Sequence, residues 1–143
     1  MAGSTKMTLA FAALVVACNG GGPSDPEDPS NGLQVSGTWT ETSQIVSNPC
    51  GIDLPGQVTG SFQLVQSGTQ LTATSDGETV TGTLNLTTGD FTLAGSFDLN
   101  GLNVTVVQSG RFSSSTRYTA ETVITLSDGV QTCTVRTSDT GTR

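Results

Sequence analysis

Apolar and polar residues alternate with a period of two along most of the chain after residue 33. This period is typical of β-strands that bury one face, and no stretch of the region repeats with the period of a helix. Short turn sequences rich in glycine, asparagine and aspartate separate the alternating runs. The pattern predicts eight strands, at residues 34–46, 57–66, 69–75, 79–87, 90–99, 102–112, 117–126 and 130–137.

One face of these predicted strands is apolar, whereas the other is rich in threonine, serine and glutamine. The apolar set is Val58, Phe62, Leu64, Val80, Leu84, Leu86, Leu93, Phe97, Leu99, Leu102, Val104, Val106, Tyr118, Ala120, Ile124 and Leu126. An apolar inside and a polar outside are the reverse of an outer-membrane barrel. We therefore expect an all-β domain, an eight-stranded antiparallel up-and-down meander barrel, with a β-sandwich as the alternative and no significant helix after the N-terminal segment.

A glycine recurs at the centre of four apolar phrases, as Gly37, Gly60, Gly82 and Gly95. All four have the parity of the apolar face. A glycine facing inward lets strands approach closely and coil, as the closure of a small sheet requires. We interpret these glycines as closure points. Glycines that admit a ligand close to the backbone are the alternative.

The first 17 residues have the features of an export signal. Lys6 precedes an apolar run that is too short to span a bilayer of about 30 Å. The run ends in Val15-Val16-Ala17-Cys18, which resembles the lipobox of bacterial lipoproteins. The resemblance implies a lipid on Cys18 and a bacterial cell envelope protein, with the outer membrane favoured and its face left open. An ordinary secretory signal with an incidental cysteine is the alternative.

Residues 18–32 contain three prolines and, after Cys18, no apolar side chain. This composition predicts a flexible acidic tether, followed by a single domain at residues 33–143. After residue 17 the chain has four arginines, no lysine and twelve acidic residues. Such a negative charge disfavours nucleic acid and anionic lipid headgroups as partners, so the lipid would be the means of membrane attachment.

Once Cys18 carries a lipid, Cys50 and Cys133 are the two cysteines that remain. Exported proteins keep such a pair oxidised, and we predict a disulfide between them. In a closed meander, the end of the first strand and the beginning of the last meet at one rim. In an open sheet these strands would be distant edges, too far apart for a disulfide that spans about 7 Å between Cα atoms.

Gly37-Thr38-Trp39, at the beginning of the first strand of an eight-stranded meander, resembles the calycin superfamily, which includes the lipocalins. The resemblance covers about residues 35–137. It implies a barrel plugged at its lower end by Trp39 and open at its upper end. In such families an arginine of the last strand packs on the tryptophan, which points to Arg136, although its parity is outward unless a bulge intervenes.

The sequence contains no histidine, which removes the commonest general base and the commonest metal ligand. We therefore expect no catalytic residue, no metal, no cofactor and no enzymatic activity. The predicted strands give inward parity to Glu41, together with Ser43. Because a buried carboxylate is costly unless paired, either these two residues line a wet cavity or a bulge turns Glu41 outward, and we favour the bulge.

Two functions remain open. A binding module would take a small apolar ligand through the upper rim, between residues 47–57 and the turn at Asn100-Gly101. A barrel filled by its own side chains would instead be a structural or protein-interaction module of the envelope. Residues 47–57, stiffened by Pro49 and Pro55, would suit recognition of a protein partner at low entropic cost.

Overall fold

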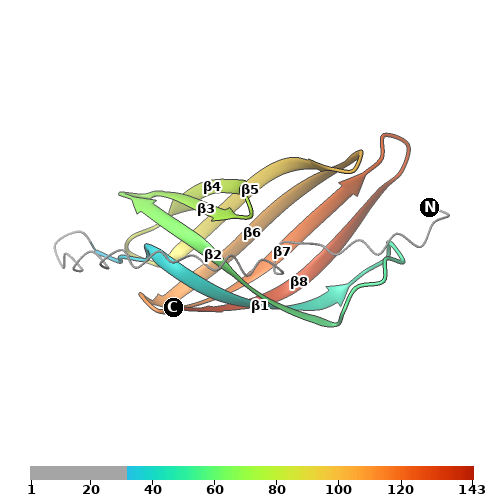
Figure 1. The fold of residues 1–143 in the computed structure, drawn as a ribbon. Coiled ribbons are helices and arrows are strands. Elements are labelled where there is room, and N and C mark those ends of the chain that lie inside the picture. Colours follow the sequence, from blue (N-terminus) through green and yellow to red (C-terminus); the bar gives the residue numbers. More distant parts are fainter. Residues whose placement is uncertain (1–31) are drawn as a thin grey trace.

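The structure, a computed structural model, describes residues 32–143. Eight strands pair in sequence order and form one closed antiparallel barrel (Figure 1). They are β1 (Gly37–Ser47), β2 (Gln57–Ser67), β3 (Gln70–Ser75), β4 (Glu78–Leu84), β5 (Asp90–Leu99), β6 (Leu102–Ser114), β7 (Arg117–Ser127) and β8 (Thr132–Thr142). The predicted meander barrel is confirmed. The predicted signal, Cys18 and the predicted tether up to residue 31 lie outside the described residues. Among residues 32–143, no helix is long and apolar enough to cross a membrane.

Several strand boundaries differ from the prediction, among them the ends of β4 and β8. β4 ends at Leu84 rather than at residue 87, because the side-chain oxygen of Asn85 accepts hydrogen bonds from the next backbone amides, at 2.9 Å from Thr87 and 3.1 Å from Thr88. This Asx-type turn replaces the sheet pairing. β8 reaches Thr142 rather than residue 137, and its last residues pair with both β1 and β7. Residues 136–142 of β8 pair with β1 and so close the barrel, and none of them is apolar.

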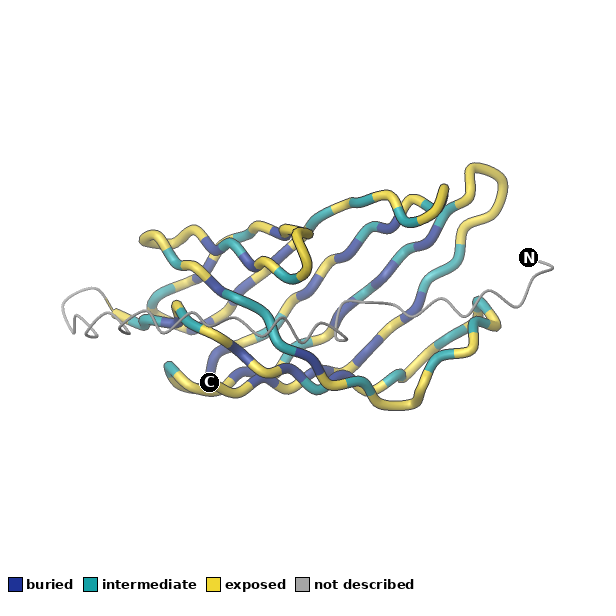
Figure 2. Tube along the Cα trace, in the orientation of Figure 1, coloured by how far each residue is buried: buried dark blue, intermediate teal, exposed yellow. Residues whose placement is uncertain are grey.

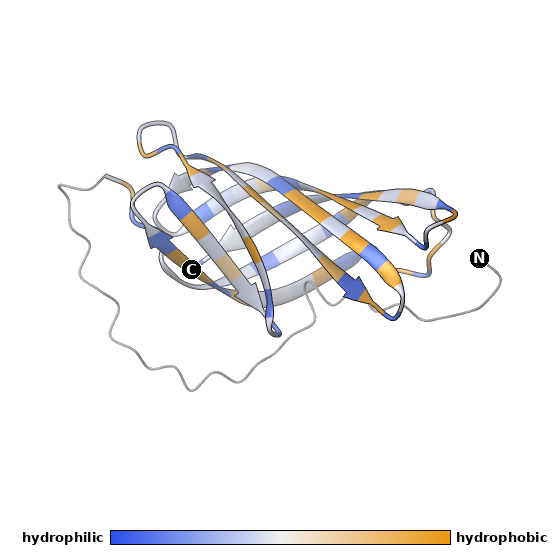
Figure 3. Ribbon diagram, turned by 90° about the horizontal axis from the view of Figure 1, so that it is seen from above, coloured by the Kyte–Doolittle hydropathy of each residue, from blue (hydrophilic) through white to orange (hydrophobic). Residues whose placement is uncertain are grey.

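The interior holds two apolar clusters. The Trp39 cluster consists of Val35, Trp39, Leu64, Leu71, Ala73, Val80, Leu84, Phe91, Leu93, Phe112 and Tyr118. The disulfide cluster consists of Val104, Val106, Ile124, Leu126 and Val135, with Ile45, Cys50, Ile52, Leu54, Phe97, Leu99 and Cys133 packed against it. Figure 2 shows buried and exposed residues alternating along β6, β7 and β8, as expected for strands with one inward face. Figure 3 shows the matching alternation of hydropathy along the strands.

Glycines stand where the closed sheet is most crowded. A Cβ atom on Gly82 would lie 1.6 Å from the carbonyl oxygen of Thr92, and one on Gly95 would lie 2.7 Å from a methyl group of Val80 on β4. These contacts agree with the interpretation of both glycines as closure points. Gly141, which the sequence did not single out, is equally crowded, since a Cβ there would lie 1.9 Å from the ring of Tyr118.

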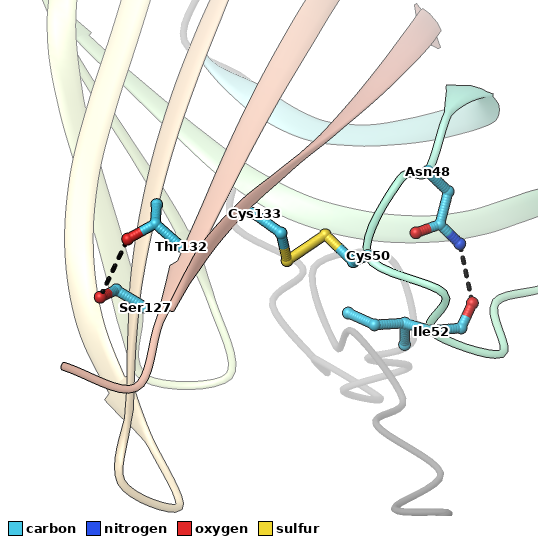
Figure 4. The surroundings of a disulfide bond; sticks show 6 residues. All are labelled: Asn48, Cys50, Ile52, Ser127, Thr132 and Cys133. Atoms are coloured by element: carbon cyan, nitrogen blue, oxygen red, sulfur yellow. Dashed lines mark hydrogen bonds between the residues drawn. A yellow bond between two sulfur atoms is a disulfide. The ribbon is translucent and has the colours of Figure 1, made fainter. Parts of the chain in front are cut away.

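A disulfide joins Cys50, in the loop after β1, to Cys133 at the beginning of β8, with 5.4 Å between their Cα atoms (Figure 4). The predicted cysteine pair is therefore present at one rim of the barrel. Within the loop, the side-chain nitrogen of Asn48 donates a hydrogen bond of 2.7 Å to the carbonyl oxygen of Ile52. The loop thus folds back on itself and covers the disulfide cluster.

The wall of the barrel is not uniform, because β3 and β4 are short (Figure 1). β2 pairs with β3 only from Gln63 to Ser67, and β4 pairs with β5 only from Thr81 to Leu84. Within the described chain, residues 57–62 of β2 and 95–99 of β5 therefore have a ladder partner on one side only. We call these two segments the half-open region. Its inward side chains, Val58, Phe62, Phe97 and Leu99, are only partly buried.

Candidate functional site

A layer of polar side chains separates the two apolar clusters inside the barrel. It consists of Glu41 and Ser43 from β1, Gln108 from β6, Thr122 from β7, and Thr137 and Asp139 from β8, all of them buried. The hydroxyl group of Tyr118 joins it from β7. We call this layer the polar belt. Its members meet because β1 pairs with β8, and β7 lies between β6 and β8.

Gln108 connects the two carboxylates of the polar belt. Its side-chain nitrogen lies 2.7 Å from an oxygen of Glu41, 3.1 Å from the hydroxyl of Thr122 and 3.3 Å from an oxygen of Asp139. Since both carboxylate oxygens lie within these distances of one nitrogen, they are at most about 6 Å apart. The belt therefore brings two acidic groups close together in the interior.

The remaining donors to these carboxylates are hydroxyl groups. Tyr118 donates to Oε2 of Glu41, and Ser43 donates to Oε1 at 3.4 Å. Thr122 donates to Oδ2 of Asp139, while Thr137 donates to Oδ1 at 2.7 Å. Every one of these donors is neutral. The belt thus satisfies hydrogen bonds without compensating the negative charge.

Ion pairs are found on the outer surface instead. Arg111 lies 2.6 Å from Asp90, and both of these side chains are largely exposed. The guanidinium of Arg111 holds the pKa of the Asp90 carboxyl below its ordinary value. Surface pairs of this kind contribute little to stability, because water and salt screen the two charges. The described ion pairs thus leave the belt carboxylates without a positive partner.

Burial raises the pKa of Glu41 above its ordinary value, and the nearby negative charge of Asp139 raises it further. Hydrogen bonds from Tyr118, Gln108 and Ser43 act in the opposite direction without cancelling this effect. Burial and the charge of Glu41 also raise the pKa of the Tyr118 hydroxyl. Tyr118 therefore remains a hydrogen-bond donor, and Glu41 takes up a proton more readily than an exposed glutamate does.

The expectation that a bulge turns Glu41 outward is wrong. Glu41 and Ser43 both face the interior, opposite Gly60 and Val58 of β2. A register shift in the pairing of β1 with β8 does occur, but it lies between Ile45 and Ser47. The donors of the polar belt offset part of the cost of burying Glu41. Sequence reasoning missed Gln108, Thr122, Thr137 and Asp139, although each has inward parity.

Trp39 fills the lower end of the barrel. Its side chain is fully buried, and its indole nitrogen donates a hydrogen bond of 2.8 Å to the carbonyl oxygen of Val35. The guanidinium that covers its ring belongs to Arg143, at 5.8 Å from the ring centroid. Arg143 also donates hydrogen bonds to the carbonyl oxygens of Ser36 and Gln34.

The prediction that Arg136 packs on Trp39 is wrong. Arg136 points outward and lies 3.3 Å from Glu121 on the neighbouring strand. Val135 faces inward, so the next residue must face outward in a regular strand. Because β8 continues regularly to Thr142, inward parity returns at Arg143, which reaches the lower end of the barrel.

A small hollow lies beside the polar belt, and we call it the Glu41 hollow. Its walls are Glu41, Phe62, Ala73, Thr74, Ser75, Val80, Leu93 and Gln108. Its volume is about 20 Å³, which is enough for one group the size of a water molecule. Of the two proposed cavity residues, Glu41 lines it and Ser43 does not. Phe62 belongs to both the hollow and the half-open region, so the two adjoin.

No protein-family model, curated protein or solved structure matches this chain. The functional evidence therefore lies in the side chains of the barrel interior.

Glu41 predicts an unusual pH dependence of stability. Its pKa in the folded state lies above the ordinary value of 4.5, so the folded state binds the proton more tightly than the unfolded state does. The contribution of Glu41 to stability is therefore fully present below pH 4.5 and is lost as the pH rises through the raised pKa. We expect Glu41→Gln to remove this dependence and to raise the free energy of unfolding at pH 7 by about 1 to 2 kcal/mol.

Urea denaturation of the wild type and of Glu41→Gln, at several pH values between 4 and 8, measures this difference. Glu121→Gln, on the outer face, is the matched control and should not change the slope. Equal pH profiles for the wild type and Glu41→Gln would contradict the prediction.

Proposed function

We propose that this protein is a lipid-anchored lipoprotein of the bacterial cell envelope whose calycin-like barrel binds a small apolar ligand. One observation carries the ligand proposal. The inward apolar side chains of the half-open region are only partly buried, whereas those of the Trp39 cluster are buried almost completely. A ligand that covered Val58, Phe62, Phe97 and Leu99 would complete the apolar interior.

The energetics favour a ligand of modest size. Removing apolar surface from water contributes about 25 cal/mol for each Å², and small-molecule sites are concave and mostly apolar with a few polar groups. The half-open region has this composition, with the polar belt at its inner end. The Trp39 cluster fills the opposite half of the barrel, so the ligand would lie between β2 and β5 rather than along the whole axis.

The lipid anchor is supported by the signal-like N-terminus and by Cys18 in its lipobox-like sequence. The lipid would hold the barrel at the membrane without a basic patch on the protein. Metabolic labelling with a palmitate analogue tests the anchor, since the label should be lost in Cys18→Ser.

A non-catalytic structural or protein-interaction module is the second candidate. It is favoured by the small volume of the Glu41 hollow and by the loop that the disulfide fixes at the upper rim. In both proposals the protein is not an enzyme. A hollow of about 20 Å³ does not admit a substrate larger than a water-sized group.

Titration with the neutral apolar dye N-phenyl-1-naphthylamine tests the ligand proposal. We expect a saturable rise in fluorescence with the wild type and a loss of affinity of at least about tenfold in Val58→Trp, because the new ring would occupy the half-open region. Val65→Trp, which places the same ring on the outer face of β2, is the matched control. Its affinity should equal that of the wild type.

The control also accounts for dye bound by the apolar N-terminal run, which both variants retain. Circular dichroism verifies that both variants are folded. Absence of saturable binding, or equal binding by the two variants, would contradict the ligand proposal and favour the interaction module.

A further inference from the structure

We propose that the ligand is an amphiphilic amine whose protonated ammonium group enters the Glu41 hollow while its apolar chain lies in the half-open region. The inference rests on the proposed function, which supplies the site for the chain. What it adds is the chemistry of the head group and the residue that selects it, Glu41.

The size of the Glu41 hollow fits a compact head group. A volume of about 20 Å³ admits a single group no larger than water, and a primary ammonium is of this size. The apolar residues of the hollow are Phe62, Ala73, Val80 and Leu93, and its polar residues are Glu41, Gln108, Thr74 and Ser75. A chain attached to the head group would pass Phe62 and then reach Val58 and Phe97.

The charge around the hollow favours a cation over an anion. Glu41 and Asp139 both accept hydrogen bonds from Gln108, and all their donors are neutral. An ammonium group would compensate this negative charge in surroundings of low dielectric constant, where the attraction is much stronger than in water. A fatty acid would bring a third carboxylate to the same place, and repulsion would oppose its entry.

Glu41 also has hydrogen-bonding capacity left for a ligand. Its Oε2 accepts from Tyr118 and from Gln108, but the donor to Oε1 is the hydroxyl of Ser43 at the long distance of 3.4 Å. Each carboxylate oxygen can accept two hydrogen bonds. An ammonium group in the hollow could therefore donate to Oε1 without displacing the strong donors of the belt.

Competition between matched amphiphiles tests the inference on the full chain. Dodecylamine, dodecanol and dodecanoate share one chain length and differ in head group. At pH 7, and below their aggregation concentrations, they compete with N-phenyl-1-naphthylamine. We expect dodecylamine to bind at least about tenfold more tightly than dodecanoate, with the affinity of dodecanol between them. A tenfold ratio of dissociation constants is the size expected for one modest electrostatic contact.

Variants then assign the selectivity. Glu41→Gln should lower the affinity for dodecylamine about tenfold and leave that for dodecanol unchanged, because the amide keeps the shape and removes the charge. Asp139→Asn, which removes the second charge, should reduce the amine preference as well and serves if Glu41→Gln does not fold. Glu121→Gln, on the outer face, is the matched control and should keep the full preference.

The outcomes separate the two proposals. If the dye binds but the three amphiphiles compete equally, or if dodecanoate competes best, the ammonium inference is overturned while the ligand proposal stands. An amine preference that survives both Glu41→Gln and Asp139→Asn also overturns the inference. If the dye shows no saturable binding and no amphiphile binds, the proposed function fails, and this inference fails with it.

Discussion

Loss of the disulfide between Cys50 and Cys133 lowers the free energy of unfolding by about 4.5 kcal/mol, as expected for the 83-residue separation in the chain-entropy account. Domains of ordinary stability have only about 5 to 15 kcal/mol in total. The double variant Cys50→Ser/Cys133→Ser should therefore be close to unfolding at 37 °C. Urea denaturation of this variant, beside the oxidised and the reduced wild type, measures the loss.

The reduced wild type is the control, because it keeps the cysteine side chains and should lose nearly the same stability as the double variant. A loss below about 1 kcal/mol in both would contradict the prediction. The packing of Ile52 and Leu54 against the disulfide cluster would then be sufficient to hold the loop.

The rim disulfide and the closure of the barrel could both be predicted from the sequence, because both follow from the order and direction of the strands. Turn residues at regular spacing define consecutive hairpins, and a meander that closes brings its first and last strands together. Cys50 and Cys133 then fall at the same rim, and the structure places them there. This deduction needs only the order and direction of the strands, which local sequence patterns carry.

The polar belt could not be predicted by following apolar side chains. Gln108 and Thr122 each interrupt the otherwise apolar face of a strand. Glutamine and threonine are residue types that are mostly exposed in proteins, so neither is expected in a core. In β8 the inward residues after Val135 are Thr137 and Asp139, so the apolar pattern stops although the strand continues. Extending the period of two through these positions would have placed all four in the interior.

The arginine that covers Trp39 illustrates the same limit. The predicted last strand ended at residue 137, so Arg143 lay outside it and Arg136 remained as the candidate. The end of β8 is fixed by its pairing with β1 and β7, because Thr142 pairs with Thr40 on one side and with Arg117 on the other. Tertiary pairing of this kind is not encoded in the local pattern of a polar segment.

The half-open region depends on register as well as on strand length. The predicted strand at 79–87 extends beyond the end of β4, so the sequence did not indicate the low wall on this side of the barrel. Which inward residues this exposes depends on pairs such as Gln63 with Thr74 and Leu84 with Phe91. Those pairs are set by packing across the barrel, so the site emerges only from the assembled sheet.

The lower end of the barrel is tightly packed, whereas the half-open region is only partly buried. The Trp39 cluster packs four aromatic rings, with Trp39 5.3 Å from the ring centroids of both Phe112 and Tyr118. Tyr118 connects this cluster to the belt through its hydrogen bond to Glu41. The packed lower end thus holds the carboxylate in position, while beside the short β3 and β4 the side chains of Val58 and Phe97 remain only partly buried.

Replacement of Trp39 by alanine should lower the free energy of unfolding by about 4 kcal/mol, because it removes a fully buried aromatic side chain and leaves a cavity. It also removes the hydrogen bond to Val35 and the surface on which Arg143 packs. Thermal unfolding followed by circular dichroism measures the loss without needing tryptophan fluorescence, which this variant lacks.

The two arginines provide the matched comparison for this lower end. Arg143→Gln should cost about 1 kcal/mol, since it removes the cation over the ring. Arg136→Gln should change stability by no more than about 0.5 kcal/mol, because its ion pair with Glu121 is exposed. Double variants with Trp39→Ala separate the contributions, because the effect of Arg143→Gln should largely vanish without the tryptophan. An equal effect of Arg143→Gln with and without Trp39 would show that this arginine does not act through the tryptophan ring.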